Sequence, residues 1–203
     1  MVEGAPLLTD HAVERTALKE WAVLVDAMAR GDIIAMVRKG GIREKRAGFE
    51  VHHDRFLLYP TFFHENTEDL ASRFHPTLAP AHDRRPAAGR VRLTHFAECV
   101  AVWTVVDPGS LPGVAHEHGL APAAVSSRFH YRDDPTVRII ATRIRALPTA
   151  VEIPEATRYA GCVSWLELDA DVHVRDAGPV LPEADLQRRV AAMSAVLGSP
   201  DLR

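Results

Sequence analysis

The stretch VRLTHFAECVAVWTVV, residues 91–106, is the longest part of the chain with the character of a β-strand. Valine, threonine and aromatic residues dominate it, and these residue types favour the pleated backbone of a sheet. Asp107 and Pro108 follow directly and end the pattern. We expect one bent strand or two strands in succession, and in either case β-structure at the middle of the chain.

A second strand is predicted at residues 136–146, TVRIIATRIRA, where apolar and polar residues alternate. Alternation of this kind is typical of a strand with one buried and one polar face. The expected faces carry Ile140, Thr142 and Ile144 on one side and Arg143 and Arg145 on the other.

Shorter segments complete the predicted sheet. They lie at residues 33–38, 49–51, 56–59 and 161–168, with Pro60 expected to end the third of them. Because these strands come in runs and do not alternate with helices, an antiparallel sheet is favoured over a doubly wound one.

Helices are predicted at both ends of the chain. Residues 15–30 place Leu18, Trp21 and Val25 at helical spacing, and residues 182–197 carry a similar apolar stripe that Gly198 ends. Shorter helical segments are expected at residues 68–74 and 121–128, and the three tryptophans, Trp21, Trp103 and Trp165, are expected in the core.

The fold class expected is a single α+β domain over residues 1–203. Its sheet would be curled and mostly antiparallel, with a PUA-like partial barrel as one form, and helices would flank it at both ends. Residues 75–90 hold three prolines and no periodicity, which predicts a mobile loop.

Composition narrows the class of protein. The chain has 203 residues, of which 47% are hydrophobic and 25% charged, and this balance is typical of a globular domain. Its two cysteines match no zinc or disulfide pattern. There is no run of 18 apolar residues and no basic leader at the N-terminus, so we expect a cytoplasmic protein with no membrane partner and no cofactor.

Charge is uneven along the chain. Residues 33–146 hold 16 basic and 12 acidic residues, whereas both ends are acidic. Of the 24 basic residues 21 are arginine, which binds phosphate in a bidentate manner. A basic middle predicts an anionic partner, while arginines that only solvate the surface give the same pattern.

Five blocks of sequence resemble the uncharacterised, mostly bacterial family domain of unknown function 1802, over roughly residues 15–170. The family is defined by sequence alone, so the resemblance implies no activity. More loosely, a strand leading into Lys-Gly-Gly is similar to the PUA, ASCH and EVE group of small barrels, which implies a cleft for RNA or a modified base. The five blocks are ALKEWAV (17–23), VRKGGIRE (37–44), FLLYPTFFHE (56–65), SRFHYR (127–132) and YAGCVSWLEL (159–168).

The strongest candidate for a binding site is the basic turn at residues 38–46, with five basic residues and one acid. Glycines let a ligand approach the backbone, and cations attract phosphate. Tyr59 and Thr61 lie at the end of a strand, where binding groups are frequent. A charged hairpin turn and a solvated sheet face are the competing interpretations. The predicted ligand-binding residues are Arg38, Lys39, Gly40, Gly41, Tyr59, Thr61, Arg128, Arg143 and Arg145.

Histidines suggest a different chemistry. Imidazole and carboxylate groups are good ligands for zinc or iron, and four such residues lie around residues 52–64. Solvated histidines explain the same pattern, and no HExxH motif is present. The candidates for a metal site are His52, His53, Asp54 and His64.

Three functions follow from these candidates. The first is a binding module for RNA, DNA or a small phosphate-bearing ligand in a basic cleft. The second is a metal-dependent hydrolase, such as a nuclease, and the third is a structural or partner-binding protein. The sequence leaves open whether the chain is an enzyme, and it sets no oligomeric state.

Overall fold

The two longest strands pair with each other along the middle of the sheet. In the computed structural model, which describes residues 12–39, 53–131, 134–161 and 163–201, β4 (Arg90–Val105) runs antiparallel to β5 (Val137–Pro154). The ladder shifts register between residues 93 and 95 and between residues 99 and 101. The stretch at 91–106 therefore forms one long irregular strand. Of the two predicted forms, one bent strand or two strands in succession, the first is confirmed.

The sheet has the strand order β2-β5-β4-β3-β1-β6, and β7 pairs with β5. Among the described strands only β1 and β3 pair in parallel, so the sheet is mixed and mostly antiparallel, which confirms the α+β class. Strands β2 and β6 end the path at opposite edges, so the sheet is open, without the curl of the predicted partial barrel. The remaining strands are β1 (Val13–Trp21), β2 (Ala35–Arg38), β3 (Arg55–Thr61), β6 (Trp165–His173) and β7 (Gly178–Pro179).

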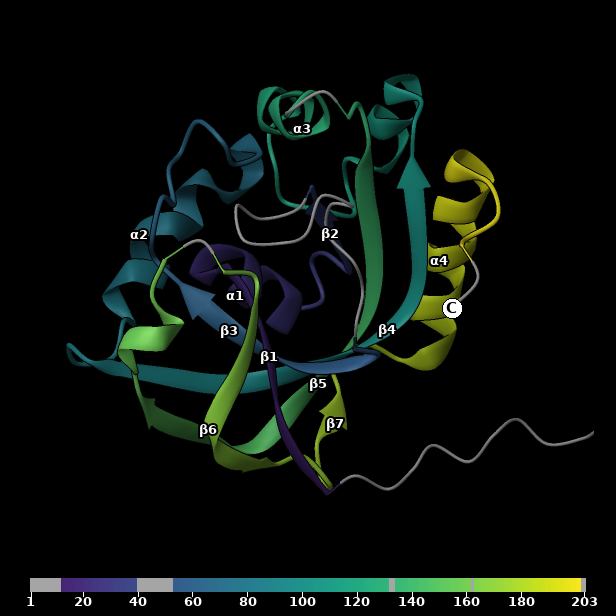
Figure 1. The fold of residues 1–203 in the computed structure, drawn as a ribbon. Coiled ribbons are helices and arrows are strands. Elements are labelled where there is room, and N and C mark those ends of the chain that lie inside the picture. The colour runs from purple at the N-terminus through teal and green to yellow at the C-terminus, as the bar shows by residue number, and fades with distance from the viewer. Residues whose placement is uncertain (1–11, 40–52, 132–133, 162, 202–203) are drawn as a thin grey trace, which may run out of the picture.

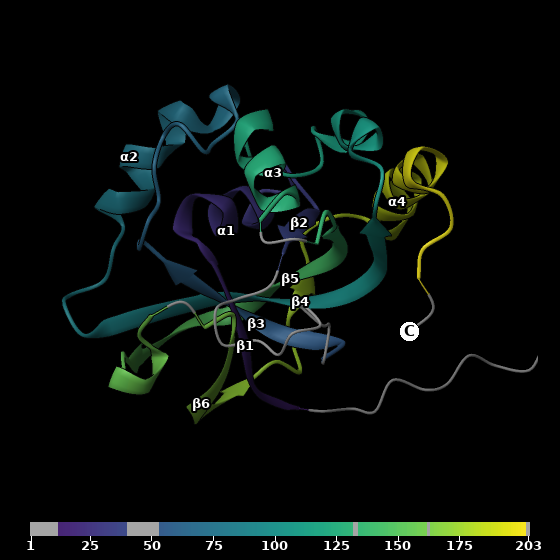
Figure 2. The same cartoon turned by 45° about the horizontal axis from the view of Figure 1, so that its top comes forward.

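Helices gather on one side of this sheet. Figures 1 and 2 show α1, α2 and α3 over the same face, with α4 beside the far part of β4. Short 3-10 segments join the larger elements: η1 (Ser72–Phe74), η2 (Pro108–Val114) and η3 (Thr157–Tyr159). The helices are α1 (Ala22–Ala29), α2 (His75–Asp83), α3 (Pro122–Phe129) and α4 (Glu183–Leu197).

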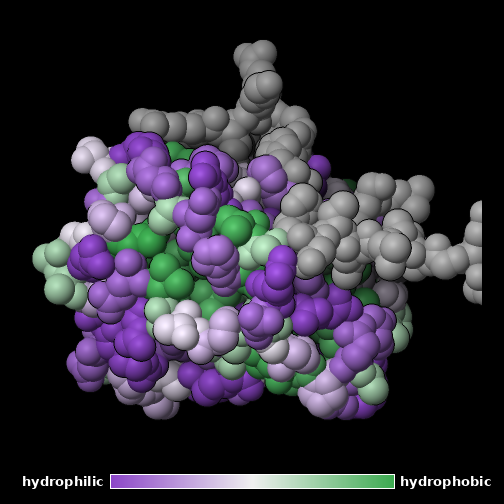
Figure 3. Space-filling view, turned by 90° about the horizontal axis from the view of Figure 1, so that it is seen from below, coloured by the Kyte–Doolittle hydropathy of each residue, from purple (hydrophilic) through white to green (hydrophobic). Residues whose placement is uncertain are grey.

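Each face of the sheet buries its own apolar cluster. In β3, Phe56 and Leu58 face the helices, whereas Leu57 and Tyr59 face the opposite side, as the alternation of a strand requires. None of the described α-helices covers the opposite side in Figure 1, and β6, β7 and η3 border it. Figure 3, which views the molecule from below, shows apolar residues between hydrophilic ones on that side.

The predicted helix at residues 15–30 is wrong in its first half. Residues Val13–Trp21 form β1, which lies between β3 and β6, and the helix begins only at Ala22. Because an inner strand is covered on both faces, adjacent residues such as Ala17 and Leu18 are both buried. That pattern mimics the spacing of a helix.

The predicted mobile loop at residues 75–90 contains α2. Pro76 lies in the first turn of this helix, where a proline costs no hydrogen bond. Two contacts attach the helix to its neighbours: the His82 ring lies 2.6 Å from the Glu65 carboxylate, and Arg84 pairs with Asp26 of α1.

Other predicted elements are present, with changed ends. Strand β5 continues through Pro148, and Pro60 lies inside β3 and does not end it. The helices at 121–128 and 182–197 are confirmed as α3 and α4. Residues 49–51 lie outside the described residues. None of the helices described is both long and apolar enough to span a bilayer.

Candidate functional site

Three of the predicted cationic residues meet at one cavity. Arg38 at the end of β2, the adjacent Lys39 and Arg128 of α3 line a hollow of about 230 Å³ together with Tyr131 and Ser164. The structure therefore brings together two parts of the sequence that are about 90 residues apart. Gly40 and Gly41 lie outside the described residues.

The charges in this cavity are engaged within the protein. Arg38 donates to the Lys19 carbonyl oxygen at 2.5 Å and to the Glu20 carboxylate at 3.1 Å. Lys39 donates to the Thr136 carbonyl oxygen at 2.7 Å, and its ammonium group lies 3.6 Å from the Asp134 carboxylate. Contacts of this kind tie β2 to its neighbours, and they reduce what these two cations can offer a ligand.

Arg128 is also used inside the fold. Its Nη1 donates to the Val37 carbonyl oxygen at 2.8 Å, and its guanidinium lies 5.6 Å from the centre of the Trp21 ring. Burial lowers the pKa of Arg128, and the nearby Glu20 carboxylate opposes that effect. Arg128 thus joins α3 to β2 and to the residue that precedes α1.

Arg143 and Arg145 lie elsewhere. Both contact one buried carboxylate, that of Glu98 on β4, at 3.0 and 3.2 Å, and Arg143 also binds Glu183 at 2.7 Å. The hydrogen bond to Glu183 raises the pKa of Arg143. Arg138, which pairs with Arg38, is five residues away from Arg143 along β5, which is about 17 Å of strand. The five predicted cations therefore do not share one cleft.

A larger cavity, of about 300 Å³, opens where β1 and β3 end. Because these two strands are parallel neighbours, Lys19 of β1 and Tyr59 and Thr61 of β3 arrive at the same edge of the sheet. The start of β4 adds Arg90 and Arg92. We call this hollow the cationic cavity; its other lining residues include Phe62, Phe63, Arg85, Glu155, Tyr159 and Gly161.

Among the described residues, four cations and one carboxylate, that of Glu155, line the cationic cavity. Arg85 lies 4.9 Å from the centre of the Phe62 ring, and Arg92 is exposed. Within the part of the chain that the structure describes, neither of these guanidiniums pairs with a carboxylate. Arg90 donates to the Glu152 carbonyl oxygen at 3.3 Å and lies 4.0 Å from the Glu152 carboxylate. The cavity therefore has a positive rim whose charge is only partly neutralised.

Tyr59 lines the cavity and carries a buried hydroxyl. The residue is 1% exposed, and its hydroxyl group has no hydrogen-bond partner among the described residues. Burial raises the pKa of Tyr59, and the nearby Glu155 adds to that effect, so the phenol stays protonated and can donate. Its ring meets the Tyr159 ring edge-on, with centroids 6.1 Å apart.

An exposed aromatic ring stands at the same cavity. Phe63 lies two residues after the end of β3 and is 60% exposed, which is unusual for a phenylalanine. Its backbone N–H donates to Thr61 Oγ1 at 3.3 Å, which fixes the turn that presents the ring. The site thus combines cations, a buried donor and a stacking surface.

The proposed metal ligands do not assemble. His53 and Asp54 precede β3 and His64 follows it, so about 20 Å of extended strand separates them. His53 stacks edge-on against Trp165, and His64 lies against Phe63. His52 lies outside the described residues, and within those residues no three His, Cys, Asp or Glu side chains gather to hold a metal ion.

Sequence reasoning finds only part of the cationic cavity. Tyr59 and Thr61, both predicted as ligand-binding residues, line it. The pattern does not single out Arg85 and Arg90, which lie in the predicted mobile loop, or Arg92, which lies in the predicted strand at 91–106. A signal is present: with Arg84, these residues place four arginines within residues 84–92.

Comparison with known proteins gives a family and two similar structures. A family model described as "Domain of unknown function (DUF1802)" matches residues 17–192, which confirms the resemblance of the sequence blocks. The crystal structure of ASCH from Zymomonas mobilis is similar, with a TM-score of 0.41 and 9% identity over 87% of this chain and 93% of that one. The crystal structure of a serine-to-alanine mutant of the Zymomonas mobilis ASCH protein is also similar, with a TM-score of 0.42. Its sequence identity is 13% over 88% of this chain and 97% of that one. No curated protein matches.

Proposed function

This chain belongs to the family of domain of unknown function 1802, and from that premise we propose that it is a binding module for a nucleotide, free or as one unit of single-stranded nucleic acid, held in the cationic cavity. The observation that carries the proposal is that one cavity is lined by two arginines with no carboxylate partner among the described residues, Arg85 and Arg92, and by Tyr59, whose hydroxyl has no hydrogen-bond partner among them. A volume of about 300 Å³ lies at the lower end of small-ligand sites, which suits one nucleotide.

The phosphate would lie against the arginines at the rim. A guanidinium offers two parallel N–H donors to a phosphate, and such charge-assisted hydrogen bonds are about twice as strong as neutral ones. Arg92 is exposed and Arg85 lies on the face of Phe62, so neither must break an ion pair within the described residues to bind. Binding at these positions adds Coulomb attraction without the loss of such a pair.

The base would lie against the exposed ring of Phe63. A stacked base gains about 1–3 kcal/mol on an aromatic side chain, and a ring that is already exposed needs no rearrangement to supply it. The Tyr59 hydroxyl is a neutral donor, so it can serve a phosphate oxygen or a carbonyl oxygen of the base. Either contact would satisfy a buried group that has no partner among the described residues.

Binding of this kind depends steeply on salt. Each phosphate contact on a single strand contributes about 0.7 to the slope of log affinity against log salt. The test is a fluorescence titration of end-labelled RNA and DNA octamers at about 50 and 200 mM salt. AMP and inorganic phosphate serve as competitors that separate a free nucleotide from a strand. Failure of every arm at the lower salt concentration would overturn the proposal.

The matched variants remove equal charge at two places. R85A/R92A should weaken binding at least about tenfold and lower the salt slope by about 1.4, which corresponds to two phosphate contacts. R30A/R188A removes two exposed arginines that pair with Asp32 and Asp185 at the surface, and it should leave the affinity unchanged. Equal losses in both variants would show a non-specific charge effect and would contradict the assignment.

A further inference from the structure

A third, chemically different cavity lies between η2 and α3. Its volume is about 270 Å³, and its walls are mostly apolar. It shares no lining residue with the cationic cavity among the described residues, so whatever it does is independent of the proposed nucleotide site. The lining residues are Pro108, Leu111, Pro112, Ala115, His118, Leu120, Pro122, Val125 and Ser126.

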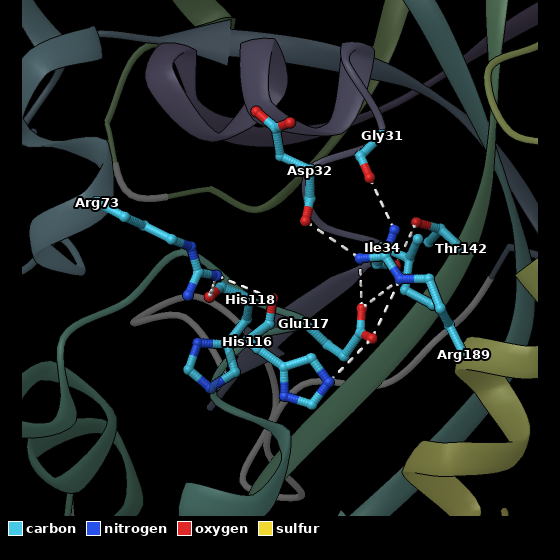
Figure 4. A network of polar contacts seen from close by, with 9 residues as sticks. All are labelled: Gly31, Asp32, Ile34, Arg73, His116, Glu117, His118, Thr142 and Arg189. Carbon is cyan, nitrogen blue, oxygen red and sulfur yellow. Dashed lines mark hydrogen bonds and ion pairs between the residues drawn. The ribbon is translucent and has the colours of Figure 1, made fainter. Parts of the chain in front are cut away.

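A buried imidazole supplies polarity to this wall. His118 is 2% exposed, and its Nδ1 accepts a hydrogen bond from the backbone N–H of Leu120 at 3.3 Å. Because Nδ1 acts as the acceptor, the proton of a neutral ring lies on Nε2. That Nε2 has no hydrogen-bond partner within the described residues. Figure 4 shows the ring turned away from the Glu117 carboxylate.

His118 stays neutral at physiological pH. Burial lowers its pKa to about 4, and the charges of Arg73 and Arg128 act in the same direction. Its Nε2–H is therefore a neutral donor in an apolar wall. Native proteins rarely leave such a group without an acceptor, so an unsatisfied donor calls for an explanation.

We propose that this cavity binds a small apolar molecule with one hydrogen-bond acceptor, such as an aryl ketone, whose oxygen receives the His118 Nε2–H. An engineered cavity of about 150 Å³ accommodates benzene, so about 270 Å³ fits a fused bicyclic molecule. The ligand would bury apolar surface against the prolines and leucines of the wall. Its oxygen would complete the hydrogen bonding of the imidazole.

The wall that carries His118 is held firmly, which favours a preformed site. The carbonyl oxygen of the preceding residue, Glu117, accepts from the backbone N–H groups of Ile34 and Ala35 at 3.2 and 2.9 Å. On the other side, a Cβ atom at Gly119 would lie 2.2 Å from Leu24 Cδ2, so glycine alone allows this close approach to α1. A preformed cavity loses less entropy when it binds a ligand.

The test uses two probes that differ in one carbonyl oxygen. 1-Indanone and indane are titrated into the full chain, and binding is followed by the ¹H–¹⁵N signals of the backbone and of the His118 ring. We expect saturable binding at the cavity, with the ketone about 3–10 times tighter, since one neutral hydrogen bond contributes that much. The His118 Nε2 signal should move with the ketone and not with the hydrocarbon.

Variants of the cavity wall keep the test independent of folding defects. H118N retains an acceptor for the Leu120 N–H and replaces the Nε2–H with an amide N–H₂ on a shorter side chain, so the preference for the ketone should decrease. A115F fills the cavity from a half-buried position and should abolish binding of both. Equal affinities for the two probes in the unaltered chain, or no saturable shift at the cavity, would overturn the inference.

Discussion

Arg189 of α4 donates two hydrogen bonds to the buried carboxylate of Glu117, from Nε at 2.9 Å and from Nη2 at 2.5 Å, both to Oε2. The same guanidinium donates to the carbonyl oxygens of Gly31 and Asp32 at 2.7 and 3.1 Å (Figure 4). One side chain thus joins the last helix, the turn before β2 and the segment that carries His118.

Removal of the Arg189 side chain should therefore lower the free energy of unfolding by much more than a substitution of an exposed residue does. R189A would leave the Glu117 carboxylate, 2% exposed, without its main partner, and breaking a buried pair in this way costs about 3–5 kcal/mol. The free energy of unfolding in urea measures the loss. R188A, one residue away and paired at the surface with Asp185, should change it by less than about 0.5 kcal/mol.

Arg143 should prove important for stability and unimportant for binding. It shares Glu98 with Arg145 and bonds Glu183 through two nitrogens, so R143A removes three charge-assisted contacts. Because the Glu98 carboxylate is buried and keeps Arg145, we expect a loss of about 1–3 kcal/mol. Affinity for the RNA octamer should be essentially unchanged. A large loss of affinity with intact folding would contradict the separation of this pair from the cationic cavity.

Removal of the Tyr59 hydroxyl should maintain or raise the stability of the protein and weaken ligand binding. Y59F removes a buried hydroxyl that has no partner among the described residues, so unfolding should require as much free energy as before or about 1 kcal/mol more. The same variant loses the donor proposed for the ligand, and affinity for AMP should fall severalfold. Thermal and urea unfolding measure the first effect and competition titration the second. A large destabilisation would mean that the hydroxyl is satisfied in solution.

Substitution of Phe63 should weaken the binding of bases and leave the binding of inorganic phosphate unchanged. Its ring is 60% exposed, so F63A should change the free energy of unfolding by less than about 0.5 kcal/mol. Loss of one stacked base should weaken octamer binding about tenfold, while competition by inorganic phosphate should be unchanged. F63Y, which preserves the ring, serves as the control and should bind normally.

Acid should destabilise the protein through His118. Its pKa in the folded state, about 4, lies below the ordinary value of 6.5, so the unfolded chain binds more protons between these two values. Stability is therefore complete above about pH 6.5 and decreases as the pH falls toward 4, by about 2 kcal/mol between pH 7 and 5. Burial also lowers the pKa of His95, which acts in the same direction.

Urea unfolding at about pH 7 and about pH 5 measures this dependence, and H118N should remove the part due to His118 and leave the part due to His95. A titration of the His118 ring by NMR provides a direct check. A midpoint near the ordinary 6.5 in the folded protein would show that the ring is solvated, and it would contradict both the pH dependence and the buried donor.

The sequence predicts best the helices and strands that are buried on one face only, because their apolar residues then recur with a clear period. The helix at 182–197 has one apolar stripe, and the strand at 136–146 alternates, so each displays its periodicity plainly. Strand β1 escapes prediction because neighbours on both faces bury adjacent residues such as Ala17 and Leu18. Helix α2 is not predicted because its sequence contains Pro76 and Pro80, which are typical of a loop. In the folded protein, contacts with Glu65 and Asp26 hold this segment in place.

By itself, the sequence determined the α+β class and the family, and it singled out Tyr59 and Thr61, which line the cationic cavity. Only the tertiary structure decided which arginines have partners within the fold. Arg128 and Arg143 are engaged by carbonyl oxygens and carboxylates from distant segments, whereas Arg85 and Arg92 have no carboxylate partner among the described residues. A cation's partners come from strand register and helix packing, which residue spacing along the chain does not encode.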